Sequence, residues 1–217
     1  ILTVAIVSMP FFFEGPNRIT QAIKGLEELK KSVDSLVIVN NQKIIEIYGD
    51  LMFTEAFKKA DDVLLTAVKG IAEIITVPGY VNVDFADVYN MMNDSGVALI
   101  GAGSATGENR ASMAVEEALN SPLLNNADIK GAKNILLNIR TGTEQIKTSE
   151  FEDIFKNIQT LAGDQVNIIW GYINDEAVDA GLSITIIATG FDMDAIPNFN
   201  NTKKEEKVVE LATEKFV

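Results

Sequence analysis

Residues 60–88 have the sequence ADDVLLTAVKGIAEIITVPGYVNVDFADV. Here and in the residues just before, apolar side chains recur at helical spacing from about residue 51 to residue 77. At the rise of an α-helix this pattern predicts a helix of roughly 40 Å, long enough to connect two domains. Pro78 and Gly79 then end the helix. The stretch therefore predicts a chain organised around one long connecting helix.

Three polar side chains, Asn82, Asp84 and Asp87, follow this stop within six positions. The simplest interpretation is the start of another helix, with Asn82 as N-cap and Asp84-x-x-Asp87 as a capping box. Negative charge in a first helical turn is also favoured by the helix macrodipole. The alternative is that both carboxylates and the amide extend from the end of the long helix to orient a water molecule or a cation. The local sequence leaves both interpretations open.

Short apolar runs rich in β-branched residues flank the long helix and predict strands covered on both faces. They lie at residues 2–7, 35–39, 96–100, 134–139, 166–170 and 182–189. Helical patterns lie between several of these runs, at 17–31, 107–121 and 148–164. In the last of them Thr148 or Ser149 is the expected N-cap, and Gly163 is the expected stop. Strands that alternate with helices predict an α/β fold.

The expected organisation has four parts. A partial α/β unit covers residues 1–50, the connecting helix 51–77, a second α/β unit 78–192 and a polar tail 193–217. Because Ile1 opens a buried-strand pattern directly, we expect the chain to be part of a longer protein. The "IPNF" segment at 196–199 is interpreted as the start of a linker.

Composition narrows the possible chemistry. The 217 residues include no cysteine and no histidine, which excludes disulfides, thiolate nucleophiles, Ser-His-Asp triads and zinc sites of the usual ligands. The net charge of −13 argues against binding to nucleic acid or to anionic membrane surfaces. Direct membrane insertion is not expected either, because no apolar run approaches the roughly 18 residues of a membrane span.

Two further segments carry candidate site residues. "GAGSATGENRA" at 101–111 follows a strand and opens a helix, so its backbone amides could face a phosphate. Arg140 could then bind the 2′-phosphate of NADP. The ordinary interpretation is a tight turn whose glycines permit close packing. In "PFFFEGPNR" at 10–18, Glu14 and Arg18 have the spacing of a surface ion pair, and the three phenylalanines indicate packing beneath a loop or stacking on a flat ring.

Several of these segments together resemble the FtsZ family of tubulin-like cell-division GTPases. The segments are "LTVAIVSMPFFFEGPNR" at 2–18, "PGYVNVDFADV" at 78–88 and "GAGSATGENRASMAVEEALNSPLL" at 101–124, within a resemblance that covers residues 1–192. The family fold is an N-terminal GTP-binding α/β domain, a long central helix and a C-terminal α/β domain with a mixed sheet. The resemblance also implies head-to-tail polymerisation into protofilaments that form a division ring.

The resemblance implies roles for particular residues. Asp84 and Asp87 are expected to position the attacking water on the neighbouring subunit's GTP, with or without Mg²⁺ or a monovalent cation, and Asn82 to hold the interface. A dedicated metal site is not expected. The nucleotide pocket is expected to comprise two groups of residues: Glu14 and Arg18 for the ribose and phosphates, and Asn41, Phe57 and Asp61 for guanine.

The chain also departs from the family pattern, since it lacks the family's glycine-rich phosphate-binding loop and the earlier strands and helices that form most of the GTPase domain. We therefore expect the chain alone to bind and hydrolyse no GTP or GDP. One alternative is a non-catalytic module that caps filaments, and a remote one is the NADP-binding domain. By resemblance the parent protein is expected in the cytoplasm at mid-cell, with itself as partner and with membrane tethers and regulators that bind its C-terminal end.

Overall fold

The computed structural model describes residues 1–121, 124, 129–163, 165–175 and 181–191. The predicted tail at 193–217 and its "IPNF" segment lie outside the described residues. A six-stranded mixed sheet in the order β1-β2-β3-β6-β4-β5 forms the centre of the molecule. Its strands are β1 (Val4–Met9), β2 (Ser35–Asn40), β3 (Gly96–Ala105), β4 (Asn134–Thr141), β5 (Asn167–Asn174) and β6 (Leu182–Phe191). Strand β6 is antiparallel to β3 and β4, and the other pairs are parallel.

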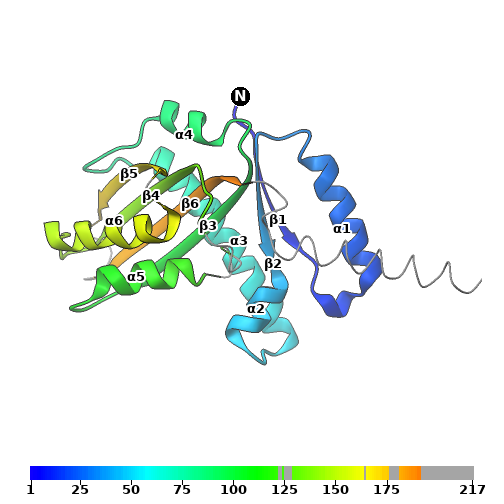
Figure 1. Cartoon of the computed structure of the whole chain (residues 1–217). Helices are drawn as coiled ribbons and strands as arrows, with labels where there is room; N and C mark the ends of the chain where they lie inside the picture. The colour runs from blue at the N-terminus through cyan, green and yellow to red at the C-terminus, as the bar shows by residue number, and fades with distance from the viewer. Residues whose placement is uncertain (122–123, 125–128, 164, 176–180, 192–217) are drawn as a thin grey trace, which may run out of the picture.

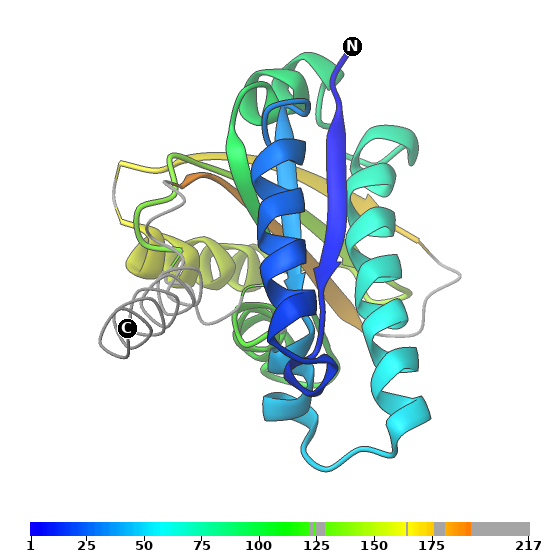
Figure 2. The same ribbon diagram turned by 90° about the vertical axis from the view of Figure 1, so that its right-hand side faces the viewer.

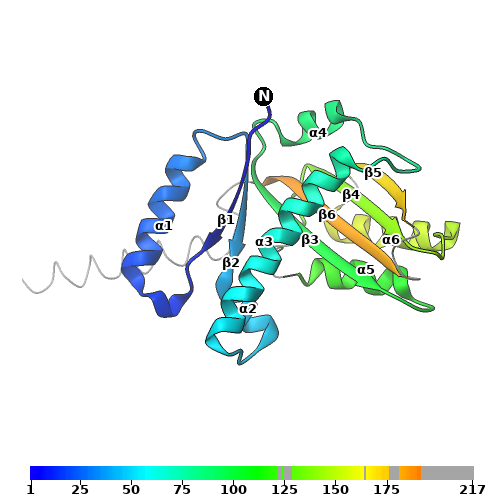
Figure 3. The same cartoon turned by 180° about the vertical axis from the view of Figure 1, so that it is seen from behind.

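Helices cover both faces of this sheet. They are the short 3₁₀ helix η1 (Phe12–Glu14) and the α-helices α1 (Pro16–Leu29), α2 (Asn41–Tyr48), α3 (Phe53–Thr76), α4 (Phe85–Met92), α5 (Arg110–Leu119) and α6 (Thr148–Ala162). Figure 1 shows α5 and α6 on one face, and Figure 3 shows α3 crossing the opposite face. Figure 2 shows α1 alongside β1 and β2. The predicted α/β fold with a long central helix and a mixed sheet is confirmed.

Helix α3 has 24 residues, and its observed bounds lie within the predicted range 51–77. Small residues on its buried face, among them Ala60, Ala67 and Gly70, allow the helix backbone to approach the sheet closely. A Cβ on Gly70 would lie only 2.9 Å from the Thr185 side chain in β6. This close contact fixes α3 against the middle of the sheet.

The sheet continues from the first unit into the second. Strands β2 and β3 are joined by three residue pairs, from Ser35–Gly96 to Val37–Ala98. The apolar core beneath α3 contains side chains from both sides of this junction, including Val39, Leu136 and Ile187. A second core lies between the sheet and helices α5 and α6. Helix α3 and the sheet therefore connect the two units through a shared core.

The glycines of "GAGSATG" do not form the predicted turn. Gly101 and Gly103 lie inside β3, and the backbone of α5 packs directly on them. A Cβ at either position would come within 2.3 Å of a helix carbonyl oxygen, that of Ala118 or Ala114. Only Gly107, with φ of 88°, lies in the turn, and α5 begins later than predicted. The glycines permit close packing, as the ordinary interpretation expected.

Two details of the helices differ from the predictions. Lys147, rather than Thr148 or Ser149, occupies the N-cap of α6, and its backbone N–H donates to Glu150. The predicted stop at Gly163 is confirmed, with φ of 100°. Helix α2 was not predicted, although Asn40 caps it through the Gln42 backbone N–H.

Arg110 is the largest fully buried side chain among the described residues, at 1% exposure. Its guanidinium forms a two-pronged contact with Glu150, Nε–Oε1 at 2.7 Å and Nη2–Oε2 at 3.1 Å, and also donates to the carbonyl oxygens of Glu144 and Gln145. The contact links the start of α5 to the start of α6. The hydrogen bond from Arg110 is the main cause that lowers the pKa of Glu150, and the same bond raises the pKa of Arg110.

We predict that Glu150→Gln lowers the free energy of unfolding by about 3 kcal/mol near neutral pH, because the buried guanidinium loses the nearer of its two charged partners among the described residues and keeps the exposed Glu144 at 3.5 Å. The folded-state pKa of Glu150 lies below its ordinary value of 4.5. Its contribution to stability is therefore complete above that value and is lost as the pH falls through the folded-state pKa. Urea unfolding at a series of pH values should show a steeper acid loss in the wild type than in Glu150→Gln. The exposed Glu152→Gln on the same helix is the control, and equal slopes in all three proteins would contradict the prediction.

Candidate functional site

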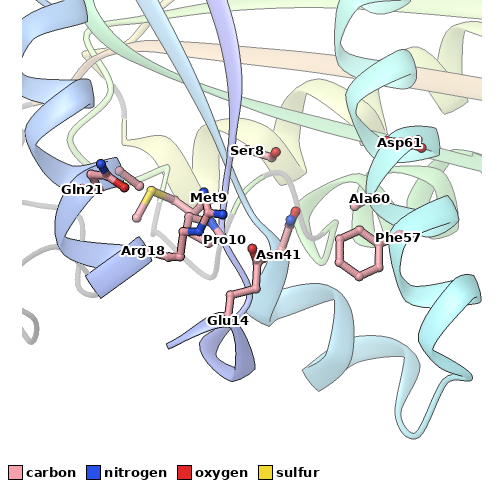
Figure 4. Close-up of a pocket in the computed structure, with 11 residues that line it drawn as sticks. Ser8, Met9, Pro10, Glu14, Arg18, Gln21, Asn41, Phe57, Ala60 and Asp61 are labelled. Atoms are coloured by element: carbon pink, nitrogen blue, oxygen red, sulfur yellow. The ribbon is translucent and has the colours of Figure 1, made fainter. Parts of the chain in front are cut away.

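A cavity of about 480 Å³ lies where β1 and β2 end. Parallel strands present their carboxyl ends at one edge of a sheet, where α/β proteins commonly bind ligands. The start of α3 closes the opposite side of the cavity (Figure 4). The lining consists of Ser8, Met9, Pro10, Glu14, Arg18, Gln21, Ala22, Asn41, Phe57, Ala60 and Asp61.

The structure brings together all five residues that the sequence predicted for a nucleotide pocket. Glu14 ends η1, Arg18 lies in the first turns of α1, and Asn41 begins α2. Phe57 and Asp61 are one turn apart on α3. Residues from four helices therefore share one cavity, although they are up to 47 positions apart in the chain, from 14 to 61.

Glu14 has a local structural task as well as its place in the cavity. Its Oε1 accepts a hydrogen bond of 2.9 Å from the Phe11 backbone N–H, and Gly15, with φ of 95°, then turns the chain into α1. No ion pair joins Glu14 to Arg18 in the described part of the chain, so the simple surface pair considered from the sequence is not formed. Arg18 is the single cation among the described residues that line the cavity.

Asn41 supplies an acceptor that has no partner within the described residues. The residue is 6% exposed, and its buried Oδ1 makes no hydrogen bond there. An unpaired buried polar group costs about 1–3 kcal/mol unless a ligand or water pairs with it. Asp61 adds a carboxylate to the same cavity, and Phe57 adds an aromatic ring that is 40% exposed. Acceptor oxygens beside an aromatic ring suit a planar heterocycle that carries N–H donors.

The three consecutive phenylalanines have different environments. Phe11 is buried, as packing beneath a loop predicts, whereas Phe12 and Phe13 are more than half exposed. Phe13 stacks on Phe11 with ring centroids 4.9 Å apart, and Phe53 lies 5.1 Å from Phe57. This aromatic rim beside the cavity was not predicted, and neither were Ser8 and Gln21 as lining residues. In the sequence, the only sign of this aromatic rim was the run of three phenylalanines directly after a strand.

The lining fits the base and sugar of a nucleotide better than its phosphates. It contains two carboxylates, of Glu14 and Asp61, against the one cation of Arg18. A triphosphate is usually held by a glycine-rich loop at the N-terminus of a helix. The described residues that line the cavity include no such loop.

The loop between α3 and α4 carries the other three predicted residues. Asp84, and not Asn82, is the N-cap of α4: its Oδ1 accepts from the Ala86 backbone N–H at 3.1 Å. Asn82 Oδ1 instead accepts from the Gly79 backbone N–H at 2.6 Å, which closes the loop on itself. Asp87 lies in the first turn of α4, where the macrodipole favours its charge. The helix-start interpretation is confirmed: Asp84, the first residue of the predicted Asp84-x-x-Asp87 box, is the cap, and the prediction of Asn82 as N-cap is wrong.

The edge of β5 holds this loop in place. Val81 and Tyr172 exchange two backbone hydrogen bonds of 3.1 and 2.9 Å in an isolated antiparallel bridge. Gly79 fits beneath the strand only because it lacks a side chain, since a Cβ there would lie 2.5 Å from the Tyr172 carbonyl oxygen. The loop is thus docked on the second unit, while Asp84 remains exposed.

The cavity and the loop lie at opposite ends of α3. Phe57 and Asp61 are near its start, whereas residues 77–84 follow its end. The helical segment between Asp61 and Thr76 alone measures roughly 22 Å at the rise of an α-helix. In Figures 1 and 3, η1 and α2 are at the bottom of the view and α4 is at the top. Asp84 and Asp87 therefore do not reach the cavity of their own chain.

Neither a metal cluster nor a nucleotide site at Arg140 is visible in the described part of the chain. No group of three or more His, Cys, Asp or Glu side chains lies there in a metal-binding arrangement. Arg140 pairs with Glu73 and Asp175 instead of facing a phosphate site. Within the same residues, no helix has both the length and the apolar character needed to span a membrane.

Comparisons with known proteins agree with this geometry. Residues 96–192 match the model of the FtsZ family C-terminal domain, and residues 1–49 match that of the Tubulin/FtsZ family GTPase domain. The chain is 44% identical over 194 residues to the cell division protein FtsZ of Porphyromonas gingivalis, covering 89% of this chain and 42% of the relative. It is 42% identical over 199 residues to FtsZ of Wigglesworthia glossinidia brevipalpis, covering 91% of this chain and 52% of that relative. The chain thus spans about half the length of the curated relatives it matches.

Solved structures show the same fold. An empty FtsZ dimer from M. jannaschii superposes with a TM-score of 0.79 at 41% identity, covering 87% of this chain and 55% of that one. TubZ protofilaments in the GDP form from Bacillus thuringiensis serovar israelensis give a TM-score of 0.70 at 14% identity, covering 98% of this chain and 59% of that one, a likeness of fold alone.

We predict that Gly79→Ala separates the loop from β5, because the new methyl group overlaps the Tyr172 carbonyl oxygen. Amide hydrogen exchange at Val81 and Tyr172 should accelerate by about tenfold or more, as expected when a local hydrogen-bonded bridge opens. Gly25→Ala in α1 is the matched control, since nothing lies within 4 Å of its Cβ position. Unchanged exchange at both amides in Gly79→Ala would show that the bridge does not depend on this glycine.

Proposed function

The chain belongs to the Tubulin/FtsZ family, and we propose on this basis that it forms part of a cell-division GTPase whose active site is shared between two subunits. In this proposal one subunit holds GTP in the cavity at the start of α3. The loop after α3 of the next subunit supplies Asp84 and Asp87. Head-to-tail repetition of this contact produces a protofilament.

One observation carries the proposal: the predicted pocket residues converge in one cavity, and the loop carboxylates lie at the far end of the same rigid helix. A helix of 24 residues cannot bend to bring its two ends together. Only a second subunit can place the carboxylates near the ligand of the first. The order of elements along the molecule therefore favours a longitudinal polymer.

The pocket residues have distinct proposed roles. The Asn41 amide oxygen and the Asp61 carboxylate accept hydrogen bonds from guanine N1–H and its exocyclic amine, which together require two acceptors. Phe57 packs on the base, Glu14 accepts from ribose hydroxyls, and Arg18 contacts phosphate oxygens. GTP itself supplies the phosphoanhydride bond that is broken. The chain's own residues bind and orient it.

The loop residues act on water in this proposal. Asp84 and Asp87 accept hydrogen bonds from a water molecule and hold it in line with the terminal phosphate of the neighbouring subunit's GTP. The Ala86 N–H fixes the Asp84 carboxylate, and the Gly79–Asn82 bond fixes the loop before it. Asn82 also lies exposed, where the next subunit can contact it. A hydrated cation near these carboxylates, Mg²⁺ or monovalent, is compatible with their charge.

Exposed aromatic side chains at both ends of the molecule support self-association. Phe12, Phe13 and Phe53 are 54–67% exposed beside the cavity, and Tyr80 and Phe85 are 86% and 53% exposed around the loop. Exposed groups of large apolar side chains often mark protein interfaces, and aromatic residues contribute strongly to such contacts. We further propose that the parent protein acts in the cytoplasm at the division site. Membrane tethers and regulators would join it there.

The isolated chain has a second candidate function, that of a filament cap. Its cavity offers one cation and lacks a glycine-rich cradle, so we propose that these 217 residues alone neither retain nor hydrolyse GTP. They still carry the loop between α3 and α4 with Asn82, Asp84 and Asp87 and the exposed rings of Tyr80 and Phe85, a surface that we call the loop face. The chain would then add to one end of a filament and stop growth there.

Mixing two defective subunits should restore GTP hydrolysis if the site is shared. In the GTPase that carries this sequence, Asp61→Ala should abolish GTP binding, and Asp87→Ala should bind GTP but turn it over at least about tenfold more slowly. A mixture places an intact loop against an intact pocket, so its phosphate release should exceed the sum of the separate rates. The adjacent Asp62→Ala is the control, because Asp62 does not line this cavity. A mixture that never exceeds the sum would contradict a shared site.

Substoichiometric addition of the isolated chain should shorten filaments of the full-length GTPase and lower their light scattering. Phe85→Asp in the isolated chain should weaken this effect several-fold, because it removes an exposed ring from the loop face. Asp at the first position of α4 is compatible with the helix macrodipole. Met113→Asp on α5, where the side chain is similarly exposed at 54%, is the matched control. Unaltered scattering with the wild-type chain would rule out capping.

A further inference from the structure

Arg140 joins three elements of the fold at the end of α3. Its Nη1 donates to both carboxylate oxygens of Glu73 in α3, at 3.1 and 3.2 Å, and its Nη2 donates to Asp175 just beyond β5. Arg140 itself belongs to β4. We call Arg140, Glu73 and Asp175 the Arg140 cluster. Its three side chains are 20–30% exposed, so the cluster is partly shielded from water.

The cluster compensates an unfavourable charge in the last turn of α3. The negative end of the macrodipole lies there, and it disfavours a carboxylate such as that of Glu73. Asp175 brings a second negative charge to the same guanidinium. Lys69 lies 3.6 Å from Glu73, but its side chain is 64% exposed and its contribution is screened by water. Arg140 is therefore the main group that holds the two carboxylates together.

The position of the cluster connects it to the loop between α3 and α4. The Glu73 carbonyl oxygen accepts from the Val77 backbone N–H, which is the last hydrogen bond before the loop begins. Four residues later Val81 pairs with Tyr172 in β5, whose neighbour Ile173 is the register partner of Arg140. Arg140 thus fixes the start of the loop to the same two strands that hold its middle. A shift of the last turn of α3 would move Asp84 and Asp87 with it.

A surface ion pair would have weaker consequences. Such pairs contribute roughly 0–1 kcal/mol and are broken with little structural effect. Arg140 differs because it contacts two elements besides its own strand and because its Nε is buried without a partner in the described part of the chain. Removal of the guanidinium leaves two shielded carboxylates close together at a helix C-terminus. The expected response is fraying of the last turn of α3.

We propose that Arg140 is a positioning residue that sets the place of the loop carboxylates by clamping the last turn of α3 to β4 and β5. This role rests on the proposed GTPase function and adds a residue to it that does not touch the nucleotide. The clamp is a property of the fold and can be measured without any activity. Its effect on catalysis is a separate measurement.

The first experiment examines the clamp in the chain itself. Arg140→Gln should accelerate amide hydrogen exchange at Val77 and Val81 by about tenfold, because both amides lie in the segment that the cluster holds. The double variant Arg140→Gln/Glu73→Gln should exchange more slowly at these amides than Arg140→Gln, since it removes the Glu73 charge, which would otherwise retain only the exposed Lys69 as a cation partner. Lys69→Gln, which removes the exposed cation from the same carboxylate, is the control and should leave exchange unchanged. Equal exchange in Arg140→Gln and the wild type would overturn the clamp.

The second experiment examines positioning in the full-length GTPase. Arg140→Gln should lower kcat by about tenfold, as expected for a small misplacement of catalytic groups, with GTP affinity within twofold of the wild type. Arg140→Lys should recover part of the loss, because lysine keeps the positive charge. Recovery should be incomplete, because a single ammonium cannot reproduce the planar contacts to two carboxylates. A wild type without GTP turnover would refute the proposed function and leave the exchange result standing. Normal kcat in an Arg140→Gln variant with accelerated exchange would refute the positioning role alone.

Discussion

The packing of α3 against the sheet is the constraint on which the rest of the structure depends. Its buried face is built from small side chains, and at Gly70 the helix approaches β6 so closely that a methyl group would not fit without a shift of Thr185. The core beneath it includes side chains from both units. Because close-packed interiors resist sliding, the helix and the sheet keep one relative position. The length of α3 then fixes the distance between the cavity and the loop.

This geometry places the cavity and the loop, the two proposed half-sites, at opposite ends of α3 on one chain. At the cavity, the buried Asn41 acceptor has no partner among the described residues, a state that a ligand with N–H donors would relieve. At the loop, the polar groups are already organised: Asp84 caps α4 and Asn82 holds the Gly79 amide. The loop therefore has ordered carboxylates but no cavity within reach. The cavity has groups that can recognise a base and a sugar, and Glu14 and Asp61 are the only carboxylates among its described lining residues. These complementary deficits at opposite ends of α3 are the physical basis of the proposed head-to-tail polymer.

The features that could be predicted from the sequence are those encoded by local patterns. Helical spacing over 51–77 predicted α3, and apolar runs predicted the six strands of the described residues, with ends that differ by up to five residues. The pocket residues were assigned through motifs that resemble a family, and the cavity contains each of them.

The remaining features depend on tertiary contacts that spacing does not encode. Asn82 and Asp84 are both good caps, and the choice between them depends on where β5 holds the loop. Gly101 and Gly103 are as compatible with a turn as with a strand. The packing of the α5 backbone on them selects the strand. The partners of Arg110 and Arg140 lie as far as 40 and 67 positions away in the chain. Nothing in a single sequence marks such pairs.

The two arginine clusters show how one type of interaction serves different ends according to burial. Arg110 is 1% exposed and binds Glu150 within the second unit, so loss of the Glu150 charge weakens the pairing of a buried cation and lowers the stability of that unit. Arg140 is 21% exposed and connects the second unit to α3. Water can partly solvate the carboxylates that a substitution of Arg140 leaves behind, so the proposed clamp predicts displacement of one helical turn without loss of the core. A cluster that is 20–30% exposed at the end of a rigid helix would therefore allow the loop to be adjusted while the fold is retained.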